Sequence, residues 1–137
     1  SPRSGLDRLD ELVERARAAG VPAIVTVNGD RRSLPAEVDR AAYRIVQEAL
    51  TNVARHAGRP ATVSVRVDYR PDGLAVQIDD DGQATPAVAP VPGTGLIGMR
   101  ERVTTLGGRL RAEPRPEGGF TVRAELPANG HGTSAAS

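Results

Sequence analysis

The chain has 137 residues with 18 basic side chains, all of them arginine, and 17 acidic ones, which gives a formal net charge of +1. A chain of this size forms one domain with an ordinary core, and the lack of cysteine excludes a disulfide scaffold, a thiolate metal site and a cysteine nucleophile. Two histidines argue against a histidine-based zinc site, and the balanced charge with only three aromatic residues argues against nucleic-acid binding.

The first part of the chain alternates helical and extended patterns. Apolar residues spaced three and four apart predict an amphipathic helix over 6–19, with Ser4 as its N-cap and Gly20 as its stop. Alternating valine and alanine residues then predict a strand over 21–27, which ends at a turn-like Asn-Gly-Asp sequence.

The longest helical pattern runs over 35–56. Pro35 suits the first helical position, and Gly58 suits the position after a helix end. The apolar stripe of this helix consists of Val38, Ala42, Ile45, Val46, Ala49, Leu50 and Val53.

The second part of the chain is predicted to be mostly extended. In order, its elements are a hairpin of strands 62–69 and 74–80, a Pro/Ala-rich loop over 83–92, a helix over 95–106, and strands over 109–113 and 120–126. The small, polar segment 128–137 is expected to be a disordered tail after a domain over 1–127. This order predicts an α+β fold, a two-layer α/β sandwich with a mixed sheet covered on one face by three helices.

Three polar residues of the long helix, Glu48, Asn52 and His56, are spaced four apart. Each step of four advances about 40° around a helix, so Glu48 and Asn52 lie along one edge of the apolar stripe. One interpretation is a solvated helix edge with a pair such as Arg44–Glu48. The other is a magnesium and phosphate site, because Mg²⁺ takes oxygen ligands and needs only one or two from the protein.

Asp80 closes the strand pattern over 74–80 on the face of Val76 and Ile78, which is the predicted core face. In one interpretation the strand ends at Asp79 and Asp80 belongs to an exposed turn. In the other, the carboxylate accepts a hydrogen bond from a ligand donor such as an exocyclic amine. Gly82 would then let the ligand lie close to the backbone.

A third motif, Gly93–Gly98, matches the pattern G-x-G-x-x-G. The dinucleotide-binding interpretation is rejected because a Pro/Ala-rich loop, rather than a strand, precedes the motif. Glycines at a helix N-terminus still expose backbone N–H groups, and the helix dipole favours phosphate there. A flexible loop with a helix cap is the alternative.

Together, in this order, the motifs resemble the catalytic ATP-binding domain of a sensor histidine kinase. Glu48–His56 (EALTNVARH) resembles the N-box, Asp80–Gly82 the first glycine box and Gly93–Arg102 (GTGLIGMRER) the second. The resemblance covers residues 5–127 and is strongest to the branch of two-component kinases that pair with helix-turn-helix response regulators. It implies a Bergerat-type (GHKL) ATP-binding fold.

The resemblance also implies roles for individual residues. Glu48 and Asn52 are expected in catalysis, with Asn52 binding Mg²⁺, Asp80 taking the adenine amine, and Phe120 making no nucleotide contact. The predicted ATP- or ADP-binding residues are Asn52, Arg55, His56, Asp80, Gly82, Gly93, Thr94, Gly95, Leu96 and Gly98.

The resemblance implies that the γ-phosphate of ATP passes to a histidine on a separate dimerisation domain, which then serves a response regulator. Neither His56 in the N-box nor His131 in the tail suits that acceptor, and the chain begins with Ser1, so we expect the cytoplasmic catalytic part of a longer, membrane-bound sensor. No run is apolar enough for direct membrane contact. The alternatives are an anti-sigma-factor-type serine kinase on the same fold, and a non-catalytic nucleotide-binding module.

Overall fold

The computed structural model describes residues 8–29, 34–56, 62–81, 94–116 and 118–127, and for residues 54–56 and 94–97 only the helical backbone. In this part the chain forms three helices and five strands. The helices are α1 (Leu9–Ala18), α2 (Ala36–His56) and α3 (Thr94–Thr105). The strands are β1 (Ala23–Asn28), β2 (Val63–Arg70), β3 (Gly73–Asp80), β4 (Arg109–Pro114) and β5 (Phe120–Pro127).

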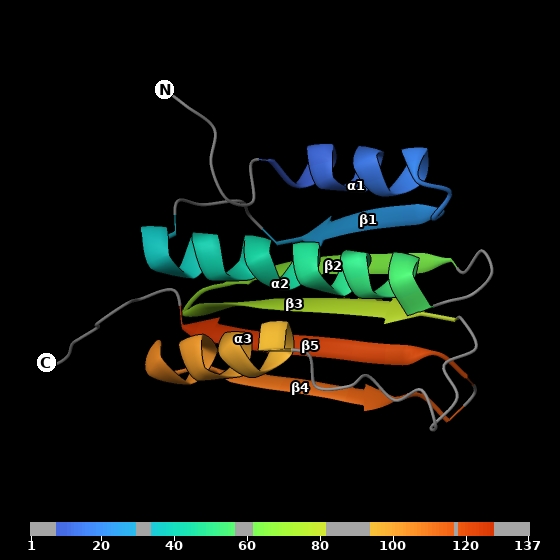
Figure 1. The fold of residues 1–137 in the computed structure, drawn as a ribbon. Coiled ribbons are helices and arrows are strands. Elements are labelled where there is room, and N and C mark those ends of the chain that lie inside the picture. Colours follow the sequence, from blue (N-terminus) through green and yellow to red (C-terminus); the bar gives the residue numbers. More distant parts are fainter. Residues whose placement is uncertain (1–7, 30–33, 57–61, 82–93, 117, 128–137) are drawn as a thin grey trace, which may run out of the picture.

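The strands form one mixed sheet in the order β1-β2-β3-β5-β4. β1 runs parallel to β2, whereas the other neighbouring pairs are antiparallel. All three helices lie on one face of this sheet (Figure 1). The predicted α+β sandwich, with a mixed sheet covered on one face, is therefore confirmed, as is the hairpin of β2 and β3.

The core lies between the helices and the covered face of the sheet. The alternating residues of β2 and β3 meet in register there, with Val65 opposite Ile78 and Val67 opposite Val76. All seven residues of the apolar stripe predicted for the long helix are buried against this face. Burial of each Val, Ile or Leu contributes about 1.5–3 kcal/mol, so α2 is held to the sheet mainly by this stripe.

The structure corrects the predicted start of the first helix. α1 begins at Leu9 rather than at residue 6, and Arg8 occupies the N-cap position without a side-chain cap hydrogen bond. Ser4, the predicted N-cap, lies outside the described residues. The apolar period continues upstream of the true start, whereas the charges of Asp10 and Glu11 favour a helix N-terminus where it is observed.

The first strand also begins later than predicted, at Ala23 instead of residue 21. Val21 is buried as its place in the apolar pattern predicts, but Pro22 follows it and has no N–H to donate to a sheet. The carbonyl of Pro22 still accepts the Val63 N–H at 2.8 Å, so pairing with β2 starts at this residue.

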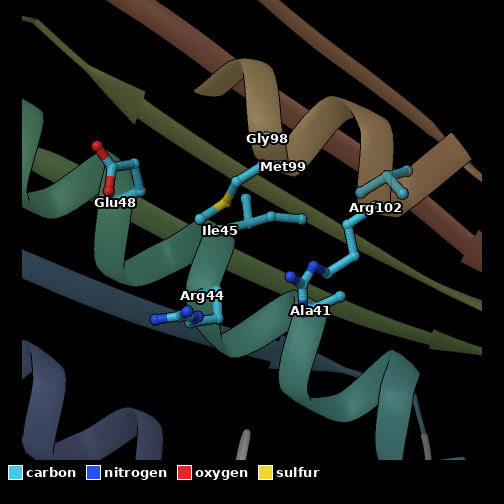
Figure 2. Close-up of a pocket in the computed structure, with 8 residues that line it drawn as sticks. Ala41, Arg44, Ile45, Glu48, Gly98, Met99 and Arg102 are labelled. Carbon is cyan, nitrogen blue, oxygen red and sulfur yellow. The ribbon is translucent and has the colours of Figure 1, made fainter. Parts of the chain in front are cut away.

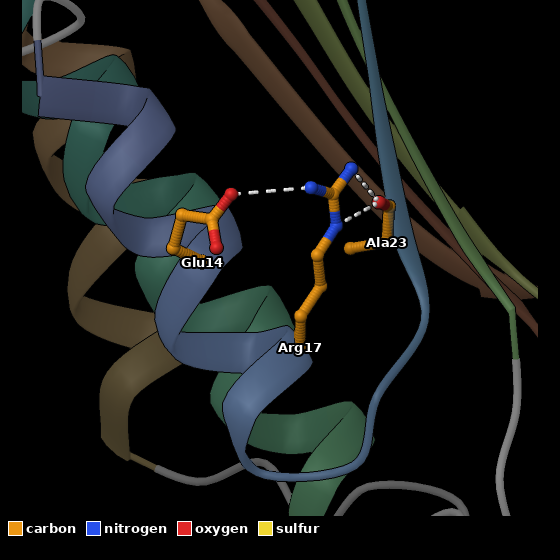
Figure 3. A network of polar contacts seen from close by, with 3 residues as sticks. All are labelled: Glu14, Arg17 and Ala23. Carbon is orange, nitrogen blue, oxygen red and sulfur yellow. Dashed lines mark hydrogen bonds and ion pairs between the residues drawn. The ribbon is translucent and has the colours of Figure 1, made fainter.

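Arg17 joins the end of α1 to the start of β1, which is an edge strand (Figure 3). Its Nε and Nη2 atoms donate to the carbonyl oxygen of Ala23 at 3.0 and 2.8 Å, and its Nη1 atom donates to Glu14 at 3.2 Å. The exposed edge of a sheet offers unpaired backbone groups to other chains. Arg17 occupies one of them and fixes the helix against the strand.

Candidate functional site

Asp80 lies at the end of β3 on the helix-covered face of the sheet. Its neighbours in register are Val63 of β2 and Phe120 of β5, and its side chain is half-buried. The predicted face is therefore confirmed, and the alternative in which the strand ends at Asp79 is wrong. A half-buried carboxylate between apolar neighbours is suited to accept a hydrogen bond from a ligand.

Glu48 and Asn52 lie one turn apart on α2, and both side chains are half-buried. They lie between the buried Ala49 and Val53 and the exposed polar side of the helix, as predicted. Although Arg44 and Glu48 are both described, the structure records no ion pair between them, so the predicted helix-edge pair is wrong in this state.

The other predicted site residues are placed only in part. Arg55 and His56 form the end of α2, and Thr94, Gly95 and Leu96 form the first turn of α3, but their side chains lie outside the described part. Gly82 and Gly93 also lie outside it. Gly98 is exposed on α3. Because α3 begins at Thr94, inside the glycine motif, the predicted position of this motif at a helix N-terminus is confirmed.

A cavity of about 220 Å³ lies between α2 and α3 (Figure 2). It is lined by Ala41, Arg44, Ile45, Glu48, Gly98, Met99, Arg102 and Val103. It therefore brings together Glu48 and Gly98, two residues predicted from separate motifs, whereas Asn52 and Asp80 do not line it. The cavity is smaller than the roughly 300–1,000 Å³ of ordinary ligand pockets, so it can hold only part of a nucleotide.

The sequence analysis missed the residues of α3 that face this cavity. Met99 points from α3 toward Ile45 of α2, and Arg102 extends over Ala41 (Figure 2). Met99, Arg102 and Val103 follow the three- and four-residue spacing of a helix face, which was the available signal. The glycines of the motif indicate phosphate binding, whereas this helix face packs against α2.

Metal binding at this site would rest on few protein ligands. Among the residues that the structure describes, no group of three or more His, Cys, Asp or Glu side chains could hold a metal ion. The amide oxygen of Asn52 and the carboxylate of Glu48 are nevertheless the oxygen donors that Mg²⁺ prefers, and Mg²⁺ usually keeps several waters and binds substrate phosphates. The donor set therefore fits a magnesium ion that arrives with a nucleotide.

A family model described as "Histidine kinase-, DNA gyrase B-, and HSP90-like ATPase" matches residues 37–130. That span includes α2 except for its first residue, all of α3, and the strands from β2 to β5. Among the described residues, no helix is both long and apolar enough to cross a membrane.

Several curated proteins are similar to the chain. The sensor histidine kinase LnrJ of Bacillus subtilis (strain 168) is 37% identical over 122 residues, which are 88% of this chain and 30% of that protein. The sensor histidine kinase YxjM of the same organism is 37% identical over 125 residues, which are 90% of this chain and 30% of that protein. The histidine-protein kinase/phosphatase DegS of Brevibacillus brevis is 34% identical over 100 residues, with coverages of 72% and 26%. The chain thus spans less than a third of each.

Solved structures share the fold. The blue-light activated histidine kinase EL346 of Erythrobacter litoralis superposes with a TM-score of 0.75 at 24% identity, over 95% of this chain and 43% of that one. The mycobacterial sensor histidine kinase MprB superposes with a TM-score of 0.60 at 22% identity, over 87% of this chain and 93% of that one.

Proposed function

The chain belongs to the family of histidine kinase-, DNA gyrase B- and HSP90-like ATPases, and we propose that it is the ATP-binding catalytic domain of a sensor histidine kinase. The observation that carries the proposal is the placement of Asp80, half-buried at the end of β3 on the face that α2 and α3 cover. There the carboxylate can accept the exocyclic amine of adenine in a charge-assisted hydrogen bond, which contributes about 1.5–3 kcal/mol.

The proposed phosphate end of the site is built from α2 and the N-terminus of α3. Asn52 would hold Mg²⁺, which would neutralise charge on the phosphate oxygens. Glu48, one helical turn before Asn52, would hold a metal-bound or attacking-site water or polarise the acceptor. Arg55 and His56 contact the phosphates, together with the backbone of 93–98 at the start of α3. Gly82 leaves room for the base.

The proposed reaction moves the γ-phosphoryl group of ATP to an imidazole nitrogen. In such reactions the protein mainly positions the reactants and neutralises charge. The acceptor histidine belongs to a dimerisation domain of the same sensor, and a response regulator receives the phosphoryl group afterwards. We place the domain, over 1–127, on the cytoplasmic side because its proposed substrate is ATP.

Titration calorimetry with ADP and with GDP, each with Mg²⁺, tests the proposal. GDP carries an oxygen acceptor in place of the exocyclic amine at the base position that Asp80 would read. We therefore expect ADP to bind at least about tenfold more tightly, since a half-buried carboxylate acceptor discriminates against a group that cannot donate a hydrogen bond. Equal affinity for the two nucleotides, or no binding of either, would contradict the proposal.

The transfer step has its own test. Incubation of the chain alone with ATP labelled at the γ-phosphate should leave no acid-labile phosphate on the protein, because the acceptor histidine lies on another domain. Strong labelling of the chain by itself would show that its own His56 or His131 accepts the phosphoryl group.

A further inference from the structure

Two aspartates, Asp79 and Asp80, end β3, and Asp81 follows directly after the strand. Asp79 points to the face of the sheet opposite the helices, where its carboxylate accepts the Thr121 hydroxyl at 2.7 Å and the Gln77 amide at 2.9 Å. The bond from Thr121 joins β3 to β5, and the bond from Gln77 lies within β3. Asp79 is therefore fixed on the far face, and the alternation of the strand directs the side chain of Asp80 to the covered face.

Asp81 extends the pairing with β2 beyond the end of the strand. Its carboxylate accepts the backbone N–H of Thr62 at 2.8 Å, and its own N–H donates to the Thr62 carbonyl at 3.2 Å. The peptide after Asp80 is thus held from the β2 side.

Arg115 holds the peptide of Asp80 from the other side. This half-buried arginine lies in the turn between β4 and β5, and its Nη1 atom donates to the carbonyl oxygen of Asp80 at 3.0 Å. The turn is closed by two backbone bonds, from Arg115 N–H to the Gly119 carbonyl and from Gly118 N–H to the Arg115 carbonyl, both 3.0 Å long. A bond from a charged donor is stronger than a neutral one.

One of the two glycines of this turn, Gly119, allows the contact. Gly119 has a φ of 94° and lies so close to β3 that an added Cβ would collide with the carbonyl oxygen of Asp80. The turn can therefore approach the strand end closely enough for the guanidinium of Arg115 to reach the carbonyl. Arg115 and Asp80 are 35 residues apart in the chain, so the bond is purely tertiary.

We propose that Arg115 is a positioning residue for nucleobase recognition, which fixes the peptide of Asp80 and thereby aims the Asp80 carboxylate at the exocyclic amine of the base. The proposal rests on the proposed function, in which Asp80 takes that amine. Since the strand end is held by Arg115 on one side and by Asp81 on the other, the carboxylate is preorganised before the ligand arrives. Preorganisation strengthens binding by lowering the ordering cost at the moment of association.

A cycle of two ligands and two proteins tests this role. The affinities of ADP and of purine riboside diphosphate, which lacks the exocyclic amine, are measured by calorimetry for the wild type and for Arg115→Ala. In the wild type, removal of the amine should lower the affinity about 10- to 100-fold. In Arg115→Ala that factor should fall below about threefold. The free-energy contributions of residues in one hydrogen-bond network are coupled, and a displaced Asp80 carboxylate would weaken only the bond to the amine.

Two further variants separate positioning from a general structural effect. Arg115→Lys keeps a positive donor. On a logarithmic scale, it should recover at least half of the ratio between the two ligand affinities that Arg115→Ala loses. Arg111→Ala removes an exposed arginine of β4 on the opposite face and should leave both affinities within twofold of the wild type. If Arg115→Ala melts below the assay temperature, Arg115→Gln, which removes the charge at similar length, replaces it under the same criterion.

The outcomes for the two proposals differ. If the amine matters in the wild type but Arg115→Ala weakens both ligands by the same factor, Arg115 does not aim Asp80, and this inference is wrong while the proposed function stands. If the wild type itself binds both ligands equally, the assignment of Asp80 to the amine is wrong, and both proposals fail together.

Discussion

Asn52 lies one helical turn after Glu48 on α2, and its half-buried amide oxygen is the proposed protein ligand of Mg²⁺. Replacement by alanine removes that ligand without disturbing the buried stripe. We expect Asn52→Ala to abolish most of the gain in ADP affinity that Mg²⁺ gives, with a loss of about tenfold or more. The measurement is the ADP dissociation constant with Mg²⁺ and with a chelator.

Thr51→Ala is the matched control for Asn52, because Thr51 is the exposed neighbour on the same turn. Its magnesium dependence should equal that of the wild type. A normal magnesium dependence in Asn52→Ala would remove Asn52 from the proposed metal site.

Gly119 and Gly20 share a φ of 94° but differ in their surroundings. A Cβ at Gly119 would collide with Asp80, whereas a Cβ at Gly20 meets nothing within 4 Å. Gly20→Ala should therefore cost only the strain of the left-handed conformation, about 1–2 kcal/mol. Gly119→Ala should cost at least about 2 kcal/mol more, because the turn must also move away from β3.

Urea unfolding of these two variants measures that difference. Equal losses in the free energy of unfolding would show that the turn yields easily, and that its close approach to Asp80 is not a fixed feature of the fold.

The placement of Asp80 could be predicted from sequence, whereas the contact with Arg115 could not. Period-two alternation is local, and it assigned Asp80 to the face of Val76 and Ile78 correctly. Arg115 lies in a Pro/Gly-rich turn and donates to a backbone carbonyl, which every residue carries, so no side-chain pattern marks the partner. The roles of Glu48 and Asn52 in catalysis and of the glycine motif in phosphate binding stay predictions.

At the scale of elements, α1 and β1 precede the span that the family model matches, yet they complete the sheet and its helical layer. β1 pairs with β2 from Ala23 to Asn28, and Arg17 connects α1 to the outer edge of β1. The first two elements therefore belong to the same folded unit as the site.

The contribution of Arg17 to the free energy of unfolding can be measured. We expect Arg17→Ala to lower the free energy of unfolding by about 1 kcal/mol, because two hydrogen bonds to the Ala23 carbonyl are lost at a partly exposed position. Arg15→Ala, which removes an exposed arginine from the same helix, should change it by less than about 0.5 kcal/mol. Urea unfolding compares them, and an equal effect would show that the bonds of Arg17 are not what stabilises this edge.

Element boundaries followed from local patterns, but the strand order did not. Six of the eight elements were predicted to within one residue at each end, because apolar periods and turn residues are local signals. The exceptions are the starts of α1 and β1. The apolar period continues before the first residue of α1, and Pro22 precedes the first residue of β1. The insertion of β5 between β3 and β4 depends on pairing between distant segments, which the sequence alone does not specify.

At the scale of the whole molecule, the proposed site draws on segments far apart in the chain. Its residues come from the C-terminal half of α2, the end of β3 and the start of α3. The turn between β4 and β5 contacts the end of β3 through the hydrogen bond from Arg115 to the Asp80 carbonyl. In Figure 1 the C-terminal end of α2, the end of β3 and the start of β5 lie at the same end of the sheet. A nucleotide held there by Asp80 at one end and by α2 and α3 at the other would connect both layers of the fold.

The most direct measurement is ADP titration, with Mg²⁺, of the wild type, of Asp80→Asn and of Asp68→Asn. Asp68 is a half-buried carboxylate on the opposite face of the sheet, where it accepts a hydrogen bond from Asn28 at 2.8 Å, so it is a matched control. Asp80→Asn should weaken ADP binding about 10- to 100-fold, because the charge of the acceptor is lost. Asp68→Asn should bind as the wild type does. Equal binding by all three proteins would contradict the assignment of Asp80 to the nucleotide.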